Sequence, residues 1–308
     1  MKLSRRDLLK LGAGAGLTAA VGGLEPIAAQ FPGQAMQMKT IPSSGQQLPA
    51  IGIGTRNFRS QDAELSVYRE TLATFHRLGG RLLDTSPNYG DSEDVVGGIL
   101  RDLGIRDDLF VATKVDREDR EGGIRRMEES FVKLGGDDFD LMQVHNLRGT
   151  EVQLETMKAW KDQGRFRHIG VTTSSENQYD AVEDVMRRHD LDFVQVDFAL
   201  GNRSAGDRLI PFAHDRGMAV LVNLPFGRGR MFEAVGDRPL PEWAADIDAK
   251  TWAQVFLKYV MAQPGTVIPI PGTTKPHHAV DNVGSAMGRL PDARLRQEME
   301  ELMDTFMA

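Results

Sequence analysis

The chain of 308 residues alternates short apolar segments with amphipathic segments, and this alternation constrains the fold more than any other feature. Apolar residues at helical spacing, such as Tyr68, Leu72 and Phe75, mark the amphipathic segments as helices. Strands are predicted at 51–54, 81–84, 109–114, 139–145, 167–171, 193–197, 218–223 and 266–270. Helices are predicted at 64–78, 92–101, 124–134, 151–163, 177–188, 207–216, 249–262 and 276–287. Strands separated by single helices run parallel, and eight strand–helix units close into an α/β barrel of the (β/α)8 type.

The chain divides into three regions by composition. Residues 1–29 are predicted to be a signal peptide, residues 30–37 a polar linker, and residues 38–308 the barrel. Before the first barrel strand, 39–41 and 46–48 flank Pro42-Ser43-Ser44-Gly45, which predicts a β-hairpin. A charged helix is predicted at 291–306.

The leader contains Ser4-Arg5-Arg6-Asp7-Leu8-Leu9-Lys10, which resembles the twin-arginine signal. The weakly apolar stretch after it, 11–24, is too short and glycine-rich to span a bilayer well, since a spanning helix needs about 20 apolar residues. Cleavage is expected near Ala29. We therefore expect the twin-arginine translocation machinery to export the protein to the periplasm, and we expect no stable membrane span after cleavage. A membrane tether through an uncleaved signal and a disordered N-terminal tail are the alternatives.

The composition excludes several kinds of chemistry. The chain has no cysteine, so disulfides, thiolate catalysis and cysteine-bound metals are excluded. Its histidines are scattered without metal-ligand spacing, so no metal site is expected. A net charge of −7 provides no electrostatic footprint for nucleic acid or anionic lipid.

Ionisable side chains stand at or just beyond the ends of three successive predicted strands. Asp84 and Tyr89 follow the second strand, Lys114 ends the third, and His145 ends the fourth. Closing the barrel brings these strand ends together at one mouth. An isolated phenol has a pKa of about 10, too high for ready proton donation near neutral pH, and a nearby ammonium stabilises its phenolate. The four groups therefore predict a site that donates a proton to a carbonyl oxygen.

The order Asp-x-x-x-x-Tyr, then Lys, then His resembles the catalytic tetrad of the aldo/keto reductase family, and the resemblance extends over most of 38–290. It implies NAD(P)H-dependent reduction of an aldehyde or ketone to an alcohol, or the reverse reaction. Tyr89 would then be the general acid, Lys114 and Asp84 would activate it, and His145 would orient the carbonyl group. The family also places a hairpin at the bottom of its barrel.

The same resemblance implies a nicotinamide cofactor, with NADP(H) favoured over NAD(H). Several positions depart from the family pattern: Thr173 lacks the usual amide, Asn223 replaces a stacking aromatic residue, and Gly272 and His278 replace basic residues. Lys275 offers a compensating charge for the adenosine phosphate. The implied cofactor positions are Thr172, Thr173, Gln195, Asn223, Pro225, Gly227, Arg228, Gly272, Thr273, Thr274, Lys275, His278, Asp281 and Asn282.

The identity of the small-molecule carbonyl substrate is not encoded in any motif. Phe58, Asn88 and Asn146 are predicted to form the substrate pocket together with parts of 224–248. Two other functions are compatible with a barrel: a nucleotide-binding sensor or regulatory protein without significant turnover, and an isomerase or lyase that needs no cofactor. The complete set of four strand-end residues favours the reductase.

Overall fold

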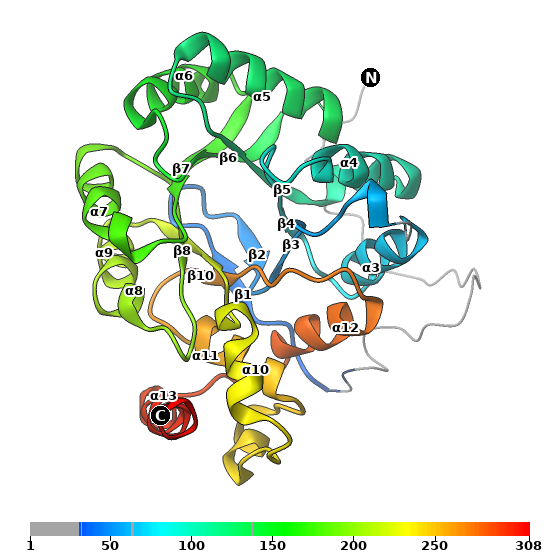
Figure 1. Cartoon of the computed structure of the whole chain (residues 1–308), viewed down its shortest axis with the longest axis vertical. Helices are drawn as coiled ribbons and strands as arrows, with labels where there is room; N and C mark the ends of the chain where they lie inside the picture. Colours follow the sequence, from blue (N-terminus) through cyan, green and yellow to red (C-terminus); the bar gives the residue numbers. More distant parts are fainter. Residues whose placement is uncertain (1–30, 32, 63–64, 137) are drawn as a thin grey trace.

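The computed structural model describes residue 31 and residues 33–62, 65–136 and 138–308. The predicted signal peptide lies outside the described residues. Eight strands form one parallel sheet, and Figure 1 shows the helices arranged around it. These strands are β3 (Gly52–Gly54), β4 (Leu82–Asp84), β5 (Phe110–Val115), β6 (Phe139–His145), β7 (Phe166–Thr172), β8 (Phe193–Asp197), β9 (Ala219–Asn223) and β10 (Val267–Pro269). The predicted (β/α)8 barrel is confirmed.

The sheet closes where β3 meets the segment after β10. The Gly54 amide donates to the Pro271 carbonyl at 3.1 Å, and Gly54 forms a parallel bridge with Gly272. A Cβ atom on Gly54 would lie 3.0 Å from the Ile270 carbonyl oxygen, tighter than most real Cβ contacts. Glycine at this position therefore permits the close approach of backbones that closes the barrel.

An antiparallel hairpin, β1 (Met38–Thr40) and β2 (Gln47–Pro49), covers one end of the barrel. Leu48 lies in β2 and Ile41 directly follows β1. Both are buried in the same apolar cluster as the inward-facing strand residues Leu82, Phe110 and Leu141. Burial contributes about 1.5–3 kcal/mol for each large apolar side chain. The hairpin is therefore part of the barrel core, as predicted.

The helices pack against the outside of the sheet, where a second and larger apolar cluster fills the space between helices and strands. They are α3 (Leu65–Arg77), α4 (Ser92–Leu103), α5 (Arg120–Leu134), α6 (Thr150–Asp162), α7 (Tyr179–Arg188), α8 (Ser204–Asp207), α9 (Leu209–Asp215), α10 (Arg230–Val235), α11 (Trp252–Met261), α12 (Pro276–Ser285) and α13 (Ala293–Met307). Of the helices in the described part of the chain, none is long and apolar enough to cross a membrane.

Local chemistry moves several helix boundaries from their predicted places. Asp119 caps α5 by accepting from the Gly122 amide at 2.7 Å, so this helix begins at Arg120 rather than residue 124. The helix predicted at 207–216 is divided into α8 and α9. Pro211 has no amide hydrogen for the carbonyl four residues earlier, and its ring clashes with a continuous helix there.

His168 on β7 is buried in the barrel interior near the hairpin. Its Nδ1 lies 3.0 Å from the Asp140 carbonyl oxygen and its Nε2 lies 3.1 Å from the Ser44 hydroxyl. A carbonyl only accepts, so Nδ1 donates to Asp140 and Nε2 accepts from Ser44. Burial lowers the pKa of His168 below its ordinary value, so the neutral imidazole ties β7 to the hairpin turn.

The lowered pKa of His168 predicts a pH-dependent stability. The unfolded chain takes up the proton at about pH 6.5 and the folded protein only at a lower pH, so the contribution of His168 to stability is complete above pH 6.5 and falls below it. One proton contributes at most about 1.4 kcal/mol to the free energy of unfolding for each pH unit between the two pKa values. Urea denaturation between pH 7.5 and 5 should therefore show a smaller pH slope for His168→Gln than for the wild type. Equal slopes would contradict this assignment.

Candidate active site

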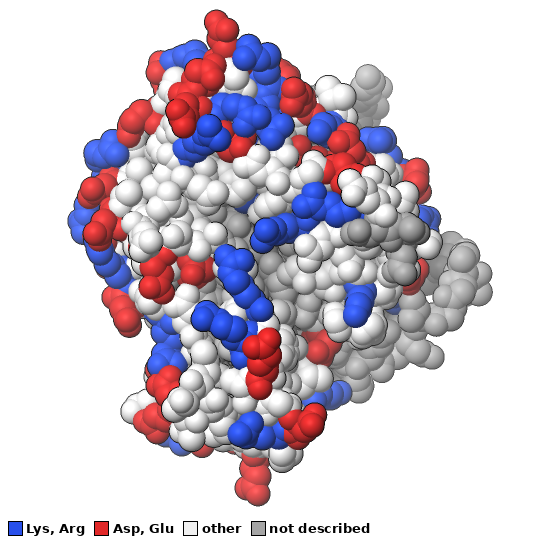
Figure 2. All heavy atoms as spheres, in the orientation of Figure 1, with Lys and Arg blue, Asp and Glu red and all other residues white. Residues whose placement is uncertain are grey.

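A cavity of about 690 Å³ opens at the carboxyl ends of the barrel strands. Figure 2 shows the face hollowed near its middle, with basic side chains bordering the depression. The strand register sets this site up, because β6 pairs His145 with Thr172 and β7 pairs Thr172 with Gln195. The lining residues are Gly54, Thr55, Arg56, Asn57, Asp84, Asn88, Tyr89, His145, Asn146, Thr172, Thr173, Ser174, Gln195, Asn223, Leu224, Pro225, Phe226, Arg228, Gly229, Ile270 and Gly272.

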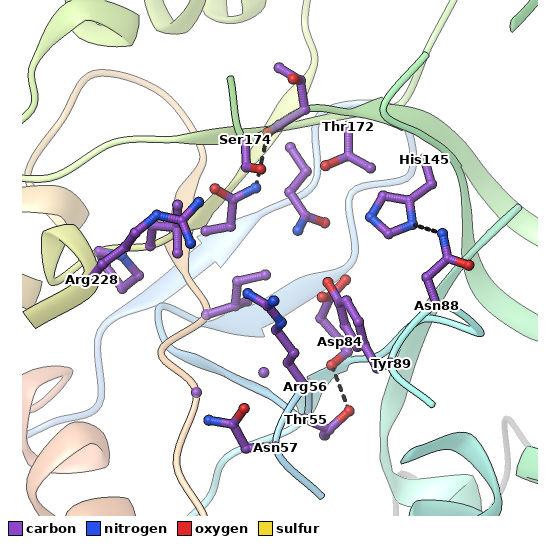
Figure 3. A pocket seen from close by; sticks show the side chains of 18 of the residues that line it. Thr55, Arg56, Asn57, Asp84, Asn88, Tyr89, His145, Thr172, Ser174 and Arg228 are labelled. Carbon is purple, nitrogen blue, oxygen red and sulfur yellow. Dashed lines mark hydrogen bonds between the residues drawn. The ribbon is translucent and has the colours of Figure 1, made fainter. Parts of the chain in front are cut away.

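Three of the four predicted catalytic residues, Asp84, Tyr89 and His145, line this cavity (Figure 3), and the fourth, Lys114, contacts Asp84 from behind its wall. The Lys114 ammonium donates to both Asp84 carboxylate oxygens at 2.8 and 2.7 Å, and to the Thr85 carbonyl at 2.7 Å. Its Nζ lies 5.2 Å from the centroid of the Tyr89 ring. The Tyr89 and His145 rings meet edge to face with centroids 6.0 Å apart. Lys114 itself stays behind the cavity wall with no exposed surface.

Lys114 is held in its charged form. Burial opposes that charge, but the Asp84 carboxylate and the Tyr89 phenol outweigh it and raise the pKa of Lys114 above its ordinary value. The site therefore keeps a fixed positive charge beside a phenol, with a carboxylate on the far side of that charge.

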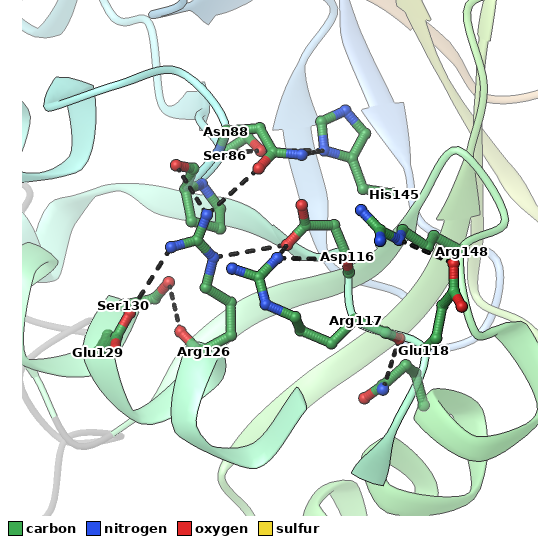
Figure 4. Close-up of polar contacts among 12 residues, drawn as sticks. Ser86, Asn88, Asp116, Arg117, Glu118, Arg126, Glu129, Ser130, His145 and Arg148 are labelled. Atoms are coloured by element: carbon green, nitrogen blue, oxygen red, sulfur yellow. Dashed lines mark hydrogen bonds and ion pairs between the residues drawn. The ribbon is translucent and has the colours of Figure 1, made fainter. Parts of the chain in front are cut away.

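His145 has a defined tautomer, because its neighbours fix the role of Nδ1 (Figure 4). The Asn88 amide oxygen accepts from Arg126 at 3.2 Å, which turns the Asn88 amino group toward Nδ1 at 3.5 Å. The Ser86 hydroxyl lies 3.1 Å from the same Nδ1. Its oxygen accepts a hydrogen bond from the Asn88 backbone amide, so the hydroxyl hydrogen is available for donation to His145. Nδ1 therefore accepts, and the ring hydrogen is on Nε2.

The imidazole of His145 is neutral at physiological pH. Burial and, second, the Lys114 charge lower the pKa of His145 to about 3. A neutral ring whose Nε2 carries hydrogen can donate a hydrogen bond to a carbonyl oxygen over a wide pH range.

Arg126, which orients Asn88, is itself anchored. Its Nη2 also donates to the Pro87 carbonyl at 3.2 Å, and its Nε lies 3.4 Å from the buried Asp116 carboxylate (Figure 4). Arg117 completes the neutralisation of Asp116 at 2.7 Å. A polar network from α5 and the β5 end thus supports the loop that carries the phenol, and sequence reasoning missed it.

Most of the residues predicted to hold the nicotinamide half of a cofactor line the cavity. Buried polar atoms test the fit: the Gln195 Oε1 and Asn223 Oδ1 atoms have no hydrogen-bond partner within the described part of the chain. Buried acceptors of this kind call for a donor, and a carboxamide provides one. The Asn223 amino group donates to the Thr173 carbonyl at 3.0 Å. Asn223 therefore acts through its amide rather than as a stacking surface.

Other cofactor positions lie close to the cavity or beyond it. Thr172, Thr173, Pro225, Arg228 and Gly272 line it, and Gly227 is buried in the turn beside Arg228. The Thr173 hydroxyl is engaged by Gln178 at 2.5 Å.

The segment from β10 into α12 carries the positions predicted for the adenosine phosphate. Thr273 accepts the Lys275 amide at 3.2 Å and is buried, and Thr274 is partly buried beside it. Lys275 and His278 are exposed at the start of α12. Lys275, His278 and the partly buried Thr274 form an accessible polar edge outside the cavity.

One predicted position, Phe58, is corrected by the structure, and two cofactor positions, Asp281 and Asn282, remain predictions. The partly exposed Asp281 carboxylate accepts from Thr251 at 2.9 Å and from Gln254 at 2.8 Å, which ties α12 to α11. Asn282 is buried in the same helix. Phe58 is fully buried against Tyr68, with ring centroids 4.9 Å apart, and does not line the substrate pocket. Its ring packs in the apolar core instead of facing the cavity.

Asn88 and Asn146 line the cavity at the places predicted for a substrate pocket. Sequence reasoning missed Thr55, Arg56 and Asn57, although they directly follow a predicted strand. The rule that strand ends meet at the barrel mouth could have found all three. Among the described residues, no cluster of three or more histidine and carboxylate side chains could hold a metal ion.

A parallel barrel with a phenol, an ammonium, a carboxylate and a neutral imidazole at its mouth has the groups needed to donate a proton to a carbonyl oxygen. Residues 50–301 match the model of the aldo/keto reductase family. The chain belongs to this family, and it is an NAD(P)-dependent oxidoreductase of the aldo/keto reductase type.

Individual relatives are distant. Aldo-keto reductase YhdN of Bacillus subtilis is 29% identical over 214 residues, which cover 63% of this chain and 63% of that protein. Aldo-keto reductase str7 of Strobilurus tenacellus is 26% identical over 274 residues, covering 75% of this chain and 81% of that protein. Among solved structures, an aldo-keto reductase from Klebsiella pneumoniae in complex with NADPH superposes with a TM-score of 0.74 at 23% identity. That superposition covers 87% of this chain and 95% of the other, and it supports the fold.

Proposed function

We propose that this protein reduces an aldehyde or ketone to an alcohol, or catalyses the reverse reaction, with Tyr89 as the general acid. The single observation that carries the proposal is the Lys114 ammonium, 5.2 Å from the centre of the Tyr89 ring and fixed by Asp84 at 2.7 Å. A positive charge held at this distance stabilises the phenolate that remains when Tyr89 gives up its proton.

The roles of the residues follow from their positions. The His145 Nε2–H donates to the carbonyl oxygen and orients it, while Asn88 and Ser86 keep the proton off Nδ1. Tyr89 transfers its hydroxyl proton to the same oxygen. Asp84 balances the charge of Lys114 and prevents its side chain from moving. When bound, a reduced nicotinamide supplies the hydride that the carbonyl carbon accepts, since no side chain can do so.

The cofactor we propose is NADP(H), with NAD(H) as the alternative. Gln195, Asn223 and Thr172 would hold the nicotinamide carboxamide, and the orphaned amide oxygens of the first two support this. Arg228 would bind the pyrophosphate. The exposed Lys275 would attract an adenosine phosphate. The Klebsiella pneumoniae structure contains NADPH, which agrees with this choice.

The proposal is tested by following NADPH oxidation with a panel of aldehydes and ketones. We expect turnover with at least one carbonyl class and a higher kcat/KM with NADPH than with NADH. Fluorescence titration should in parallel show NADPH binding in the absence of substrate. Tight binding without turnover of any panel member would favour a nucleotide-binding sensor on the same barrel, and the absence of any binding would favour a cofactor-independent isomerase or lyase.

We further propose that the chain is exported by the twin-arginine machinery to the periplasm. The supporting observation is the Arg5-Arg6 pair within Ser4–Lys10, followed by an apolar stretch. In a bacterial host with this pathway, the double substitution Arg5→Lys with Arg6→Lys should retain the protein in the cytoplasm. Fractionation and immunoblotting measure this, and Lys2→Arg, outside the motif, is the matched control. Unchanged export of the double variant would refute the proposal.

A further inference from the structure

The cavity contains two arginines without partners. Arg56 and Arg228 both line it, and neither makes a hydrogen bond or an ion pair with any residue that the structure describes. By contrast, Arg126 and Arg117 beside the cavity are bonded to Asp116 and to neighbouring backbone or amide groups. An unpaired guanidinium that faces a binding cavity offers five donors in a planar fork, and carboxylates and phosphates match that fork.

The charge of the cavity is positive although the chain as a whole carries −7. Its one acidic lining residue, Asp84, is neutralised by the buried Lys114 at 2.7 Å. His145 contributes no charge. The two arginines therefore dominate the field in the cavity, and low-dielectric walls strengthen such a field and concentrate anions. Figure 2 shows basic side chains at the edge of the hollow.

The two arginines lie on different sides of the cavity. Arg228 belongs to the turn Gly227–Gly229 after β9, and the proposed function assigns it to the cofactor pyrophosphate. Figure 3 shows Arg228 far from His145 and Asn88, whereas the Arg56 guanidinium points into the cavity that Tyr89 and Asp84 also line. One cation is thus left for an anion close to the reacting carbonyl group.

The backbone that carries Arg56 is tied to the catalytic strand end. The amide and hydroxyl of Thr55 both donate to the Asp84 carbonyl, at 3.0 and 3.1 Å. The Ser92 hydroxyl, at the start of α4, donates to the Thr55 carbonyl at 2.8 Å. These bonds fix the Cα position of Arg56 relative to the phenol, so its exposed side chain extends into the cavity from a fixed point.

We propose that the substrate is a carbonyl compound that carries a carboxylate, which Arg56 binds while its carbonyl oxygen faces Tyr89 and His145. This inference rests on the proposed function and specifies its substrate class. A single guanidinium matches a single carboxylate, with two parallel N–H···O bonds. A phosphate dianion would call for a second free cation on this side of the cavity.

The test compares pairs of substrates with the same aldehyde and with or without a carboxylate: 4-carboxybenzaldehyde against its methyl ester, and 4-oxobutanoate against butanal. For the wild type we expect kcat/KM to be about 10- to 100-fold higher for the acid of each pair, as expected for one charge-assisted interaction. Arg56→Gln should bring each ratio close to one and leave the Kd of NADPH unchanged. Arg59→Gln, on the same loop but outside the cavity lining, should retain the wild-type ratio.

Two results would overturn the inference. Wild-type ratios near one would show that the pocket does not select for charge. A loss of NADPH affinity in Arg56→Gln with an unchanged substrate ratio would assign this arginine to the cofactor. Calorimetric binding of benzoate and benzamide in the presence of NADP⁺ separates this question from turnover. Preferential benzoate binding that depends on Arg56 supports the anion site even if no carbonyl is reduced, an outcome in which only the proposed function fails.

Discussion

Tyr89→Phe is expected to lower kcat for carbonyl reduction by about 10²- to 10⁴-fold, the usual contribution of a positioned general acid. Phenylalanine retains the ring beside Lys114 and His145 but has no proton to transfer to the carbonyl oxygen. Stopped-flow measurement of NADPH oxidation under single-turnover conditions reports this step without interference from product release.

The variant should fold and bind cofactor normally, because within the described part of the chain the hydroxyl group makes no hydrogen bond with the residues proposed to hold the nucleotide. Circular dichroism and the Kd of NADPH are the controls. A rate within a factor of a few of the wild type, with both controls unchanged, would remove Tyr89 from the proposed mechanism.

The second large effect concerns stability and follows from the burial of the Asp84–Lys114 pair. Asp84→Asn leaves the Lys114 ammonium buried without its counter-charge. Lys114→Met leaves the Asp84 carboxylate buried without its counter-charge. Each single substitution is expected to reduce the free energy of unfolding by about 3–5 kcal/mol, the usual cost of an uncompensated buried charge. Urea denaturation at pH 7 measures the loss.

The double variant, Asp84→Asn with Lys114→Met, distinguishes the pair from simple packing damage. It removes both charges together, so it should be more stable than the sum of the two single effects predicts. It should nevertheless be as inactive as Lys114→Met, because no positive charge remains beside the phenol. Additive losses of stability would show that the two charges do not interact.

The barrel could be predicted from the sequence because its strands are short apolar runs, and the segments between them have apolar residues at helical spacing. The strands Phe139–His145 and Phe193–Asp197 were predicted with the bounds that the structure has. The short helix Arg230–Val235, inside the long connection after β9, was not predicted, since it has too few turns to show a periodicity. The break before α9 was missed because the spacing of apolar residues does not show that Pro211 lacks the amide hydrogen needed for a continuous helix.

The grouping of the four residues proposed for catalysis could be predicted from the sequence, because the topology of the barrel alone places the strand ends together. The direction of individual side chains could not be predicted. Phe58 and Arg56 lie two residues apart on the same loop, yet one packs into the core and the other lines the cavity. The contacts of Asp281 with Thr251 and Gln254 from another helix were likewise not readable from the sequence. Contacts between elements that are distant in sequence decide such cases.

The most direct measurement is the transfer of label from NADPH that carries deuterium at both C4 positions to a carbonyl substrate. We expect the alcohol formed by the wild type to carry deuterium on its former carbonyl carbon, as mass spectrometry of the product would show. We expect its hydroxyl hydrogen to come from solvent through Tyr89. An alcohol free of deuterium, or no alcohol from any carbonyl tested, would contradict hydride transfer at this site.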